Sequence, residues 1–227
     1  MAGCVIGAVI LALVMASGSA TRTVAPDTTA TRPAHTPTTR VSLESAAPAT
    51  TAVRSTLAGA LIDQLTVAPE GTSAGYYRAR FQHWIDADGD GCDTRCEVLE
   101  AERRTDLPGL PGGGWLSTYD GYSTDDSTEL DVDHVVALGE AWRSGADTWD
   151  ATRRRNFAND LDEPDALIAV TVSTNRSKSD RDPALWQPPN RAAWCEFGLG
   201  WVRVKIRWGL TADEAEVRAL RNIVAGC

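Results

Sequence analysis

Two short polar stretches carry residues whose types and spacing could do chemistry. The first is Asp131-Val132-Asp133-His134-Val135-Val136, and the second, about 40 residues later, is Asn175-Arg176-Ser177-Lys178-Ser179-Asp180. An imidazole near its ordinary pKa can deprotonate water at neutral pH. Asp133 and Asn175 offer the oxygens that hard cations such as Mg²⁺ prefer, and such a cation stabilises charge on phosphoryl and leaving oxygens. The two stretches therefore suit phosphodiester hydrolysis, with His134 as the general base.

Each stretch also has a simpler interpretation. A lone His after a strand Asp commonly forms only structural hydrogen bonds, and the second stretch alone could be a polar turn with a helix cap. A strand adds a geometric condition, because the neighbouring residues Asp133 and His134 face opposite sides of it. A cation bound by Asp133 would therefore lie at the end of the strand, with His134 crossing above it.

The elements that must position these residues follow from hydrophobic periodicity. Leu57, Leu61, Ile62 and Leu65 predict a first helix in a folded domain that begins near Val53. Alternating and β-branched residues predict strands over 130–138 and 166–172. Further helices are expected at 76–85, 93–104 and 140–157, with two more after the Pro-rich segment and ending near Ala225. The prediction is an α+β domain, residues 53–227, mostly helical around a small two-stranded ribbon.

At these residues the chain resembles a known superfamily of nucleases, the HNH or His-Me finger proteins. It is most similar to secreted actinobacterial HNH proteins related to the C-terminal domain of GmrSD-type restriction enzymes. The shared pattern covers residues 76–227 and includes WIDADGDGCDTR, DVDHVVALGEAW, RRRNFAND, LIAV, NRSKSD, DPALWQPP and VKIRWGL. NRSKSD also resembles the corresponding stretch of the HNH domain in RNA-guided CRISPR nucleases.

The resemblance implies a ββα-metal core and a role for each matching residue. Asp133 corresponds to the metal-binding carboxylate, His134 to the base, and Asn175 to the second metal ligand on the short helix. Lys178, one turn further along, is expected to contact phosphate. The chain departs from the family pattern where its middle Asn would fall near Ala166. Without this Asn the loop that it braces in the family would be less rigid, whereas the chemistry is less affected. Asn159 is the candidate residue to brace the loop instead.

Charge is distributed unevenly along the chain. The formal net charge is −9, which argues against binding nucleic acid by bulk electrostatics alone. From His134 onward, 13 basic and 13 acidic residues balance, so the whole excess lies upstream. Clusters of Lys and Arg are commonly solvated helix faces, but around His134 they could form a groove for a phosphate backbone. The candidate phosphate contacts are Lys178, Arg176, Arg95 and Arg155.

A second candidate site precedes the first. Asp86, Asp88 and Asp90, with Gly91 and Glu97, match the calcium-binding loop of an EF-hand. Three close carboxylates repel one another unless a cation neutralises them, which favours Ca²⁺. Asp93 stands where that loop usually has an aliphatic residue, and a disulfide within the loop would constrain Glu97. The alternative is an acidic turn that caps the helix expected from Asp93.

The N-terminus and the cysteines indicate export. The apolar run Val5–Met15 has the length of a signal-peptide core, although no Lys or Arg precedes Arg22. Residues 1–20 are therefore expected to be a signal peptide or an anchor, and residues 21–52, rich in Thr, Ala and Pro, a disordered linker. An oxidising destination suits two disulfides, and we favour Cys195–Cys227 with Cys92–Cys96. The spacing of these four cysteines does not suit zinc.

Together these features predict an exported endonuclease that uses Mg²⁺ or Mn²⁺ and cuts nucleic acid, DNA in preference to RNA. It would not be stably inserted in a membrane after processing. The alternative is an exported, calcium-stabilised binding protein on an HNH scaffold that no longer cuts. A toxin role would require a cognate inhibitor protein as a partner.

Overall fold

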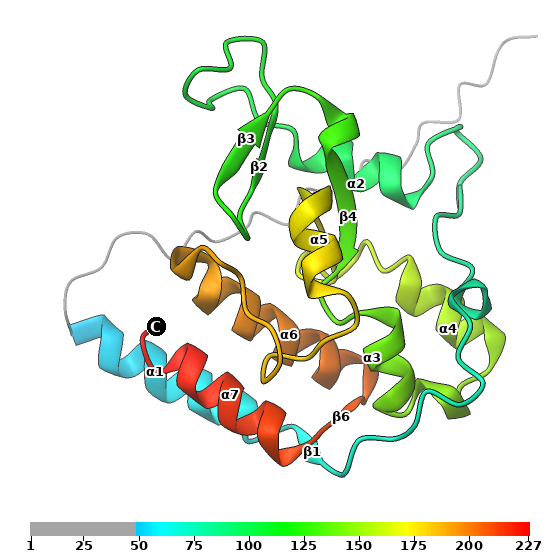
Figure 1. The fold of residues 1–227 in the computed structure, drawn as a ribbon, viewed down its shortest axis with the longest axis vertical. Coiled ribbons are helices and arrows are strands. Elements are labelled where there is room, and N and C mark those ends of the chain that lie inside the picture. The colour runs from blue at the N-terminus through cyan, green and yellow to red at the C-terminus, as the bar shows by residue number, and fades with distance from the viewer. Residues whose placement is uncertain (1–48) are drawn as a thin grey trace, which may run out of the picture. The chain divides into compact units, whose positions relative to one another are not determined.

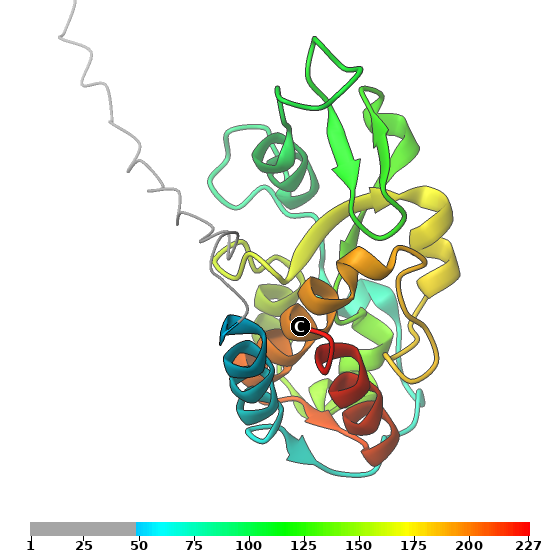
Figure 2. The same ribbon diagram turned by 90° about the vertical axis from the view of Figure 1, so that its left-hand side faces the viewer.

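The centre of the fold is a pair of antiparallel strands, β4 (Leu130–His134) and β5 (Leu167–Thr171). In this computed structural model, which describes residues 49–227, Leu130 pairs with Thr171 and His134 with Leu167. All residues of β5 are buried, as expected for a short continuous apolar run. Thr171 caps the helix that follows directly, α5 (Val172–Lys178), and Figure 2 shows β5 running into it. The predicted two-stranded ribbon is therefore confirmed.

Three helices pack against one another beside this ribbon: α1 (Ala49–Ile62), α6 (Trp194–Trp208) and α7 (Glu214–Val224) (Figure 1). Gly198 allows α6 to approach α7 closely, because a Cβ there would lie only 2.7 Å from Cγ2 of Ile223. Trp201 and Leu220 fill the same interface and are completely buried. These apolar helix faces belong to the same hydrophobic core as the buried residues of β5.

Shorter elements complete an α+β fold, as predicted. The hairpin β2–β3 and the parallel pair β1–β6 were not predicted, because their strands are only two or three residues long. The remaining elements are α2 (Thr94–Glu102), α3 (Leu138–Arg143), α4 (Ala151–Ala158), β1 (Thr66–Val67), β2 (Trp115–Ser117), β3 (Tyr122–Thr124) and β6 (Thr211–Ala212), with the 3₁₀ helices η1 (Arg78–Phe81), η2 (Ser127–Glu129), η3 (Ala146–Thr148) and η4 (Arg191–Ala193).

Two of the predicted helices are wrong in extent. The helix expected over 76–85 is only the 3₁₀ turn η1, because Gln82 and Trp84 take left-handed φ angles of 45° and 61°. Asn159 fixes this shape by binding the carbonyl of Gln82 and the amide of Ile85. The helix expected over 140–157 is divided into α3, η3 and α4, and Gly145 makes the break with a φ of 117°.

Both favoured disulfides are confirmed, Cys92–Cys96 and Cys195–Cys227. The second joins α6 to the end of the chain. The first helix begins at Ala49, slightly before the predicted Val53. The predicted signal peptide or anchor (1–20), and most of the predicted linker (21–52), lie outside the described residues. Within residues 49–227 no helix combines the length and apolar character needed to cross a bilayer.

Candidate active site

A cavity of about 390 Å³ lies where η1, β4, α3 and α5 meet. Both polar stretches identified in the sequence reach it, one through β4 and the other through α5. Its opposite wall comes from the start of η1, more than 50 residues upstream of β4. The lining residues are Tyr76, Arg78, Val132, Asp133, His134, Ala137, Leu138, Gly139, Asn175, Arg176, Ser179 and Asp180.

His134 ends β4 and is held in one orientation by α4. Its Nε2 lies 2.9 Å from the carbonyl oxygen of Ala158. Because a carbonyl oxygen only accepts, Nε2 carries the proton, and Nδ1 of the neutral ring keeps its lone pair. Nδ1 has no hydrogen-bond partner among the residues that the structure describes. The arrangement therefore leaves one nitrogen of a cavity-lining imidazole able to accept a proton.

The surroundings of His134 are apolar and aromatic. Its ring is buried and stacks with Trp84 and Phe157, at centroid distances of 5.1 Å and 6.5 Å. Burial lowers the pKa of His134 to about 3, and the Ala158 carbonyl opposes that shift only in part. The imidazole is therefore neutral across the physiological pH range.

Asp133 faces α5, on the other side of β4 from the His134 ring. Lys178 donates from Nζ to Asp133 Oδ1 at 2.9 Å and to the backbone carbonyl of His134 at 2.9 Å, and both charged side chains are buried. The Tyr119 hydroxyl donates to Asp133 Oδ2 at 3.2 Å. Burial raises the pKa of Asp133, while Lys178 acts in the opposite direction. The predicted metal-binding carboxylate is thus already neutralised, and the predicted phosphate contact is the group that neutralises it.

Asn175 is placed against Asp131 instead. Its Nδ2 donates to Asp131 Oδ2 at 3.1 Å, and its Oδ1 has no partner within residues 49–227. Asp131 and Asp133 are two residues apart on β4, so both face α5, where Asn175 and Lys178 lie one turn apart. The amide oxygen of Asn175 suits a hard cation at the cavity wall. Asp133 does not fit the same ion as placed, because the Lys178 ammonium occupies that position.

The predicted phosphate contacts differ in their surroundings. Arg176 is exposed and lines the cavity. Arg95 donates to the carbonyl of Leu130 at 3.0 Å and so supports the start of β4. Arg155 lies on α4 away from the cavity lining, and its Nε is buried without a partner in the described chain. Sequence reasoning missed Arg78, because no motif surrounds it and its segment was predicted as a regular helix.

Asn159 braces the segment that covers His134, as its candidate role required. Its amide donates to the carbonyls of Gln82 and Arg155, and its Oδ1 accepts from the amide of Ile85 and the hydroxyl of Thr94. Near Ala166 a backbone bond holds the strand end, since Ala166 O accepts from Val135 N at 3.0 Å. The segment that covers His134 and the end of β4 are therefore held by bonds from elsewhere in the chain.

The acidic loop before α2 is compact. Carboxylate oxygens of Asp86, Asp88 and Asp90 lie within 4.8 Å of one another, and Asp86 accepts from the amide of Gly91 at 3.0 Å. Glu97, the fourth candidate ligand, is not part of this group and lies in the first turn of α2, which Asp93 caps. The three Asp residues are exposed, and exposed acidic groups are common without an ion.

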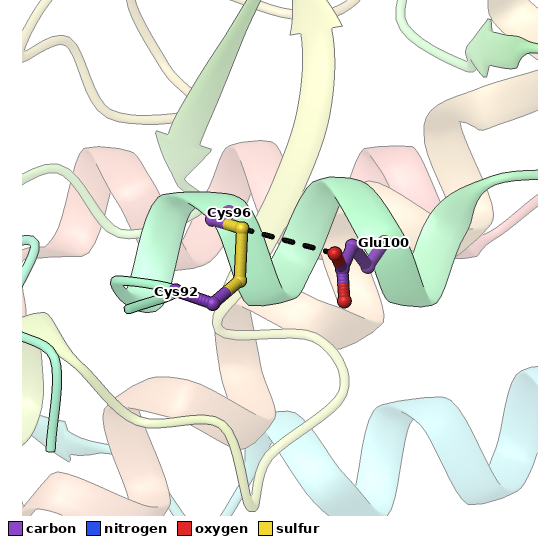
Figure 3. A group of neighbouring side chains, drawn as sticks. All are labelled: Cys92, Cys96 and Glu100. Atoms are coloured by element: carbon purple, nitrogen blue, oxygen red, sulfur yellow. Dashed lines mark hydrogen bonds between the residues drawn. A yellow bond between two sulfur atoms is a disulfide. The ribbon is translucent and has the colours of Figure 1, made fainter. Parts of the chain in front are cut away.

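A disulfide lies beside this loop. Figure 3 shows the Cys92–Cys96 disulfide with Glu100, whose Oε1 is 4.0 Å from Cys96 Sγ. Both sulfur atoms are committed to the disulfide and carry no proton, so they are neither donors nor thiolate ligands. The group is therefore a structural link between the loop and the first turns of α2.

Comparison with known proteins gives the chain a family. Residues 115–223 match the family model described as the C-terminal domain of GmrSD restriction endonucleases. A protein of Arthroderma benhamiae, named "Uncharacterized secreted protein", is 40% identical over 174 residues, or 75% of this chain and 84% of the fungal protein. No solved structure matches the chain. Most of the residues that line the cavity, His134 among them, lie within the matched region. The chain belongs to the same family as the fungal protein, and over residues 115–223 it is similar to the C-terminal domain of GmrSD restriction endonucleases.

Proposed function

We propose that the chain is an exported endonuclease that hydrolyses phosphodiester bonds in nucleic acid, DNA in preference to RNA. The observation that carries the proposal is the orientation of His134, whose Nε2–H is held by Ala158 while Nδ1 is left free. The succession of β4, β5 and α5 supports an HNH core around this residue. The family match to a restriction-endonuclease domain supports the same reaction.

In the proposed reaction, Nδ1 of His134 accepts a proton from the water molecule that attacks the phosphate. The Ala158 carbonyl then stabilises the imidazolium through a charge-assisted hydrogen bond. The low pKa of His134 belongs to the free protein, and a substrate phosphate beside the ring would add negative charge that raises it. Arg176, exposed at the cavity, would hold a phosphate oxygen.

HNH proteins generally use a divalent cation, which neutralises charge on the phosphoryl and leaving oxygens. We infer Mg²⁺ or Mn²⁺ here, with Asn175 holding the ion through its amide oxygen. Asp133 would become a ligand only after the Lys178 ammonium withdraws from it. In the free protein, the positive charge that balances Asp133 comes from Lys178 of the same chain.

Cleavage assays test the proposal. The purified full chain is expected to cut plasmid DNA in Mg²⁺ or Mn²⁺ and to lose activity in EDTA, with RNA assayed in parallel. Replacing His134→Ala should lower the rate by about 10²- to 10⁴-fold, the usual contribution of a general base. His134→Gln is the folding control, because its amide can still donate to Ala158 but cannot act as a base. Wild-type cleavage rates in both variants, with unchanged circular dichroism, would rule out His134 as the base.

A second candidate is an exported binding protein whose scaffold does not cut. The Lys178–Asp133 ion pair favours it, because that pair closes the predicted ligand position. The cluster of Asp86, Asp88 and Asp90 would take structural Ca²⁺ in this case. This candidate predicts DNA binding without cleavage in any metal, together with a melting temperature that rises with calcium.

Export is part of both candidates. Its support is the two disulfides and the name of the fungal relative, which describes that protein as secreted. Disulfides persist in oxidising compartments and are rare in the cytosol.

A further inference from the structure

We propose that Arg78 binds a phosphate oxygen of the substrate in this cavity, and that His83 is the positioning residue that orients its guanidinium. The inference rests on the proposed function and adds to it a contact from outside the HNH motifs. The juxtaposition that carries it is an exposed arginine at the cavity wall, whose Nε donates to His83 Nε2 at 3.2 Å.

The bond to His83 fixes how Arg78 can act. Because His83 Nε2 accepts from an N–H, it carries no proton, and the ring is neutral. Burial lowers the pKa of His83, and the charge of Arg78 lowers it further, so this state persists at neutral pH. With Nε engaged by His83, the guanidinium, which also interacts with the Tyr76 hydroxyl, presents its terminal nitrogens as donors, and this geometry matches phosphate.

No carboxylate of the described chain pairs with Arg78. Asp180, an acidic residue of the same cavity, forms its ion pair with Arg143 at 2.6 Å. Asp133 is likewise neutralised by Lys178. The cavity therefore contains two guanidinium groups with no anionic partner in residues 49–227, Arg78 on η1 and Arg176 on α5.

The segment that carries Arg78 is held firmly. Phe81, three residues on, is completely buried and packs edge-on against Trp142 and Tyr76. On its far side the chain is fixed by the bonds of Asn159 described above. A guanidinium on such a support keeps its direction before the substrate arrives, which lowers the entropic cost of binding.

The same turn supplies a matched control. Arg80 carries the same charge two residues away, but its guanidinium lies 5.4 Å from the centroid of Trp142 and 5.7 Å from that of Tyr77, and it does not line the cavity. A general loss of positive charge would affect both variants alike. A specific phosphate contact affects only the Arg78 variant.

Binding and cleavage should be measured separately on the full chain. Binding is titrated with a fluorescein-labelled 12-base-pair DNA duplex in EDTA over a salt series. Arg78→Ala is expected to weaken binding by about tenfold or more, as loss of a charge-assisted hydrogen bond does, and to reduce the salt slope by about one. Arg80→Ala should stay within about twofold of wild type. His83→Leu should weaken binding, whereas His83→Gln, which keeps an acceptor for Arg78, should restore most of it.

The outcomes separate this inference from the proposed function. If the wild type cuts DNA and Arg78→Ala binds and cuts like Arg80→Ala, the contact is refuted while the nuclease stands. If no protein cuts but Arg78→Ala alone loses binding, the contact stands and the nuclease is refuted. A wild type that neither binds nor cuts the duplex overturns both. Circular dichroism and urea unfolding of each variant show that the comparison is between folded proteins.

Discussion

At the scale of single residues, the most informative contact is the buried ion pair between Asp133 and Lys178. A spacing rule can name both residues but cannot say that they bind each other, because their contact depends on how α5 packs on β4. Tyr119, which fixes Asp133, stands in a stretch with no motif, and Ala158, which fixes His134, lies in RRRNFAND but acts through its backbone carbonyl, which no residue pattern marks. The identities of the polar residues were therefore predictable from the sequence, and their partners were not.

Lys178→Met tests this ion pair. Removing one member of a buried pair leaves an uncompensated charge, so the free energy of unfolding should fall by about 3–5 kcal/mol at pH 7. The raised pKa of Asp133 should rise further, so the variant should lose less stability in acid, where the carboxyl group is protonated. Urea unfolding of wild type and variant at pH 4 and pH 7 measures the loss in the free energy of unfolding at each pH.

The double variant Asp133→Asn/Lys178→Met removes both charges and should recover much of the loss. Unchanged stability in Lys178→Met would mean that the lysine is not committed to Asp133 in solution. It would then be available for the phosphate contact that the sequence predicted.

At the scale of elements, periodicity predicted those that bury a continuous apolar face or begin at a clear cap. β5 and α6 belong to the first group, and α2, which begins after the Asp93 cap, belongs to the second. The segment 76–85 has helix-compatible residues, but bonds from Asn159, more than 70 residues away in sequence, determine its shape. Such tertiary bonds override local propensity and leave no local signal.

Asn159→Ala should loosen this segment. The substitution removes acceptors and donors for Gln82, Ile85, Thr94 and Arg155, each bond contributing about 1 kcal/mol, so a loss of about 2–4 kcal/mol in the free energy of unfolding is expected. Asn156→Ala, on the helix that ends just before Asn159, is the control, because that side chain is exposed. Chemical unfolding gives the comparison, and equal stabilities would show that Asn159 is not a brace.

At the scale of the whole molecule, a second buried lysine joins elements that are distant in sequence. Lys205 on α6 donates to Glu140 on α3 at 2.9 Å, to Glu216 on α7 at 2.7 Å, and to the carbonyl of Thr211 in β6 at 2.8 Å. Arg143 adds a second positive charge beside Glu140, at 2.9 Å. By composition alone Lys205, between Arg203 and Arg207, would be placed on a basic, solvated helix face, because composition cannot distinguish an interior network from a solvated face.

This network should make stability depend on pH. Burial raises the pKa of Glu216 to about 7, while the charge of Lys205 and other partners hold that of Glu140 at about 2 despite burial. Between pH 4.5 and 7 the folded protein therefore binds more protons at Glu216 than the unfolded chain, so stability falls as pH rises through this range. Below pH 4.5 Glu140 acts in the opposite sense, and its contribution is lost as pH falls toward 2.

Glu216→Gln separates the two effects. The variant should be less stable overall, because both oxygens of Glu216 accept hydrogen bonds, one from Trp201 and one from Lys205. Its decline in stability between pH 5 and 7 should nevertheless be weaker, by about 1–3 kcal/mol, because the titrating group is gone. Glu214→Gln, on the exposed side of α7 and paired with Arg218 at the surface, should keep the wild-type slope. Parallel pH profiles for wild type and Glu216→Gln would show that Glu216 is ionised throughout, and that Lys205 and Arg143 together neutralise both carboxylates.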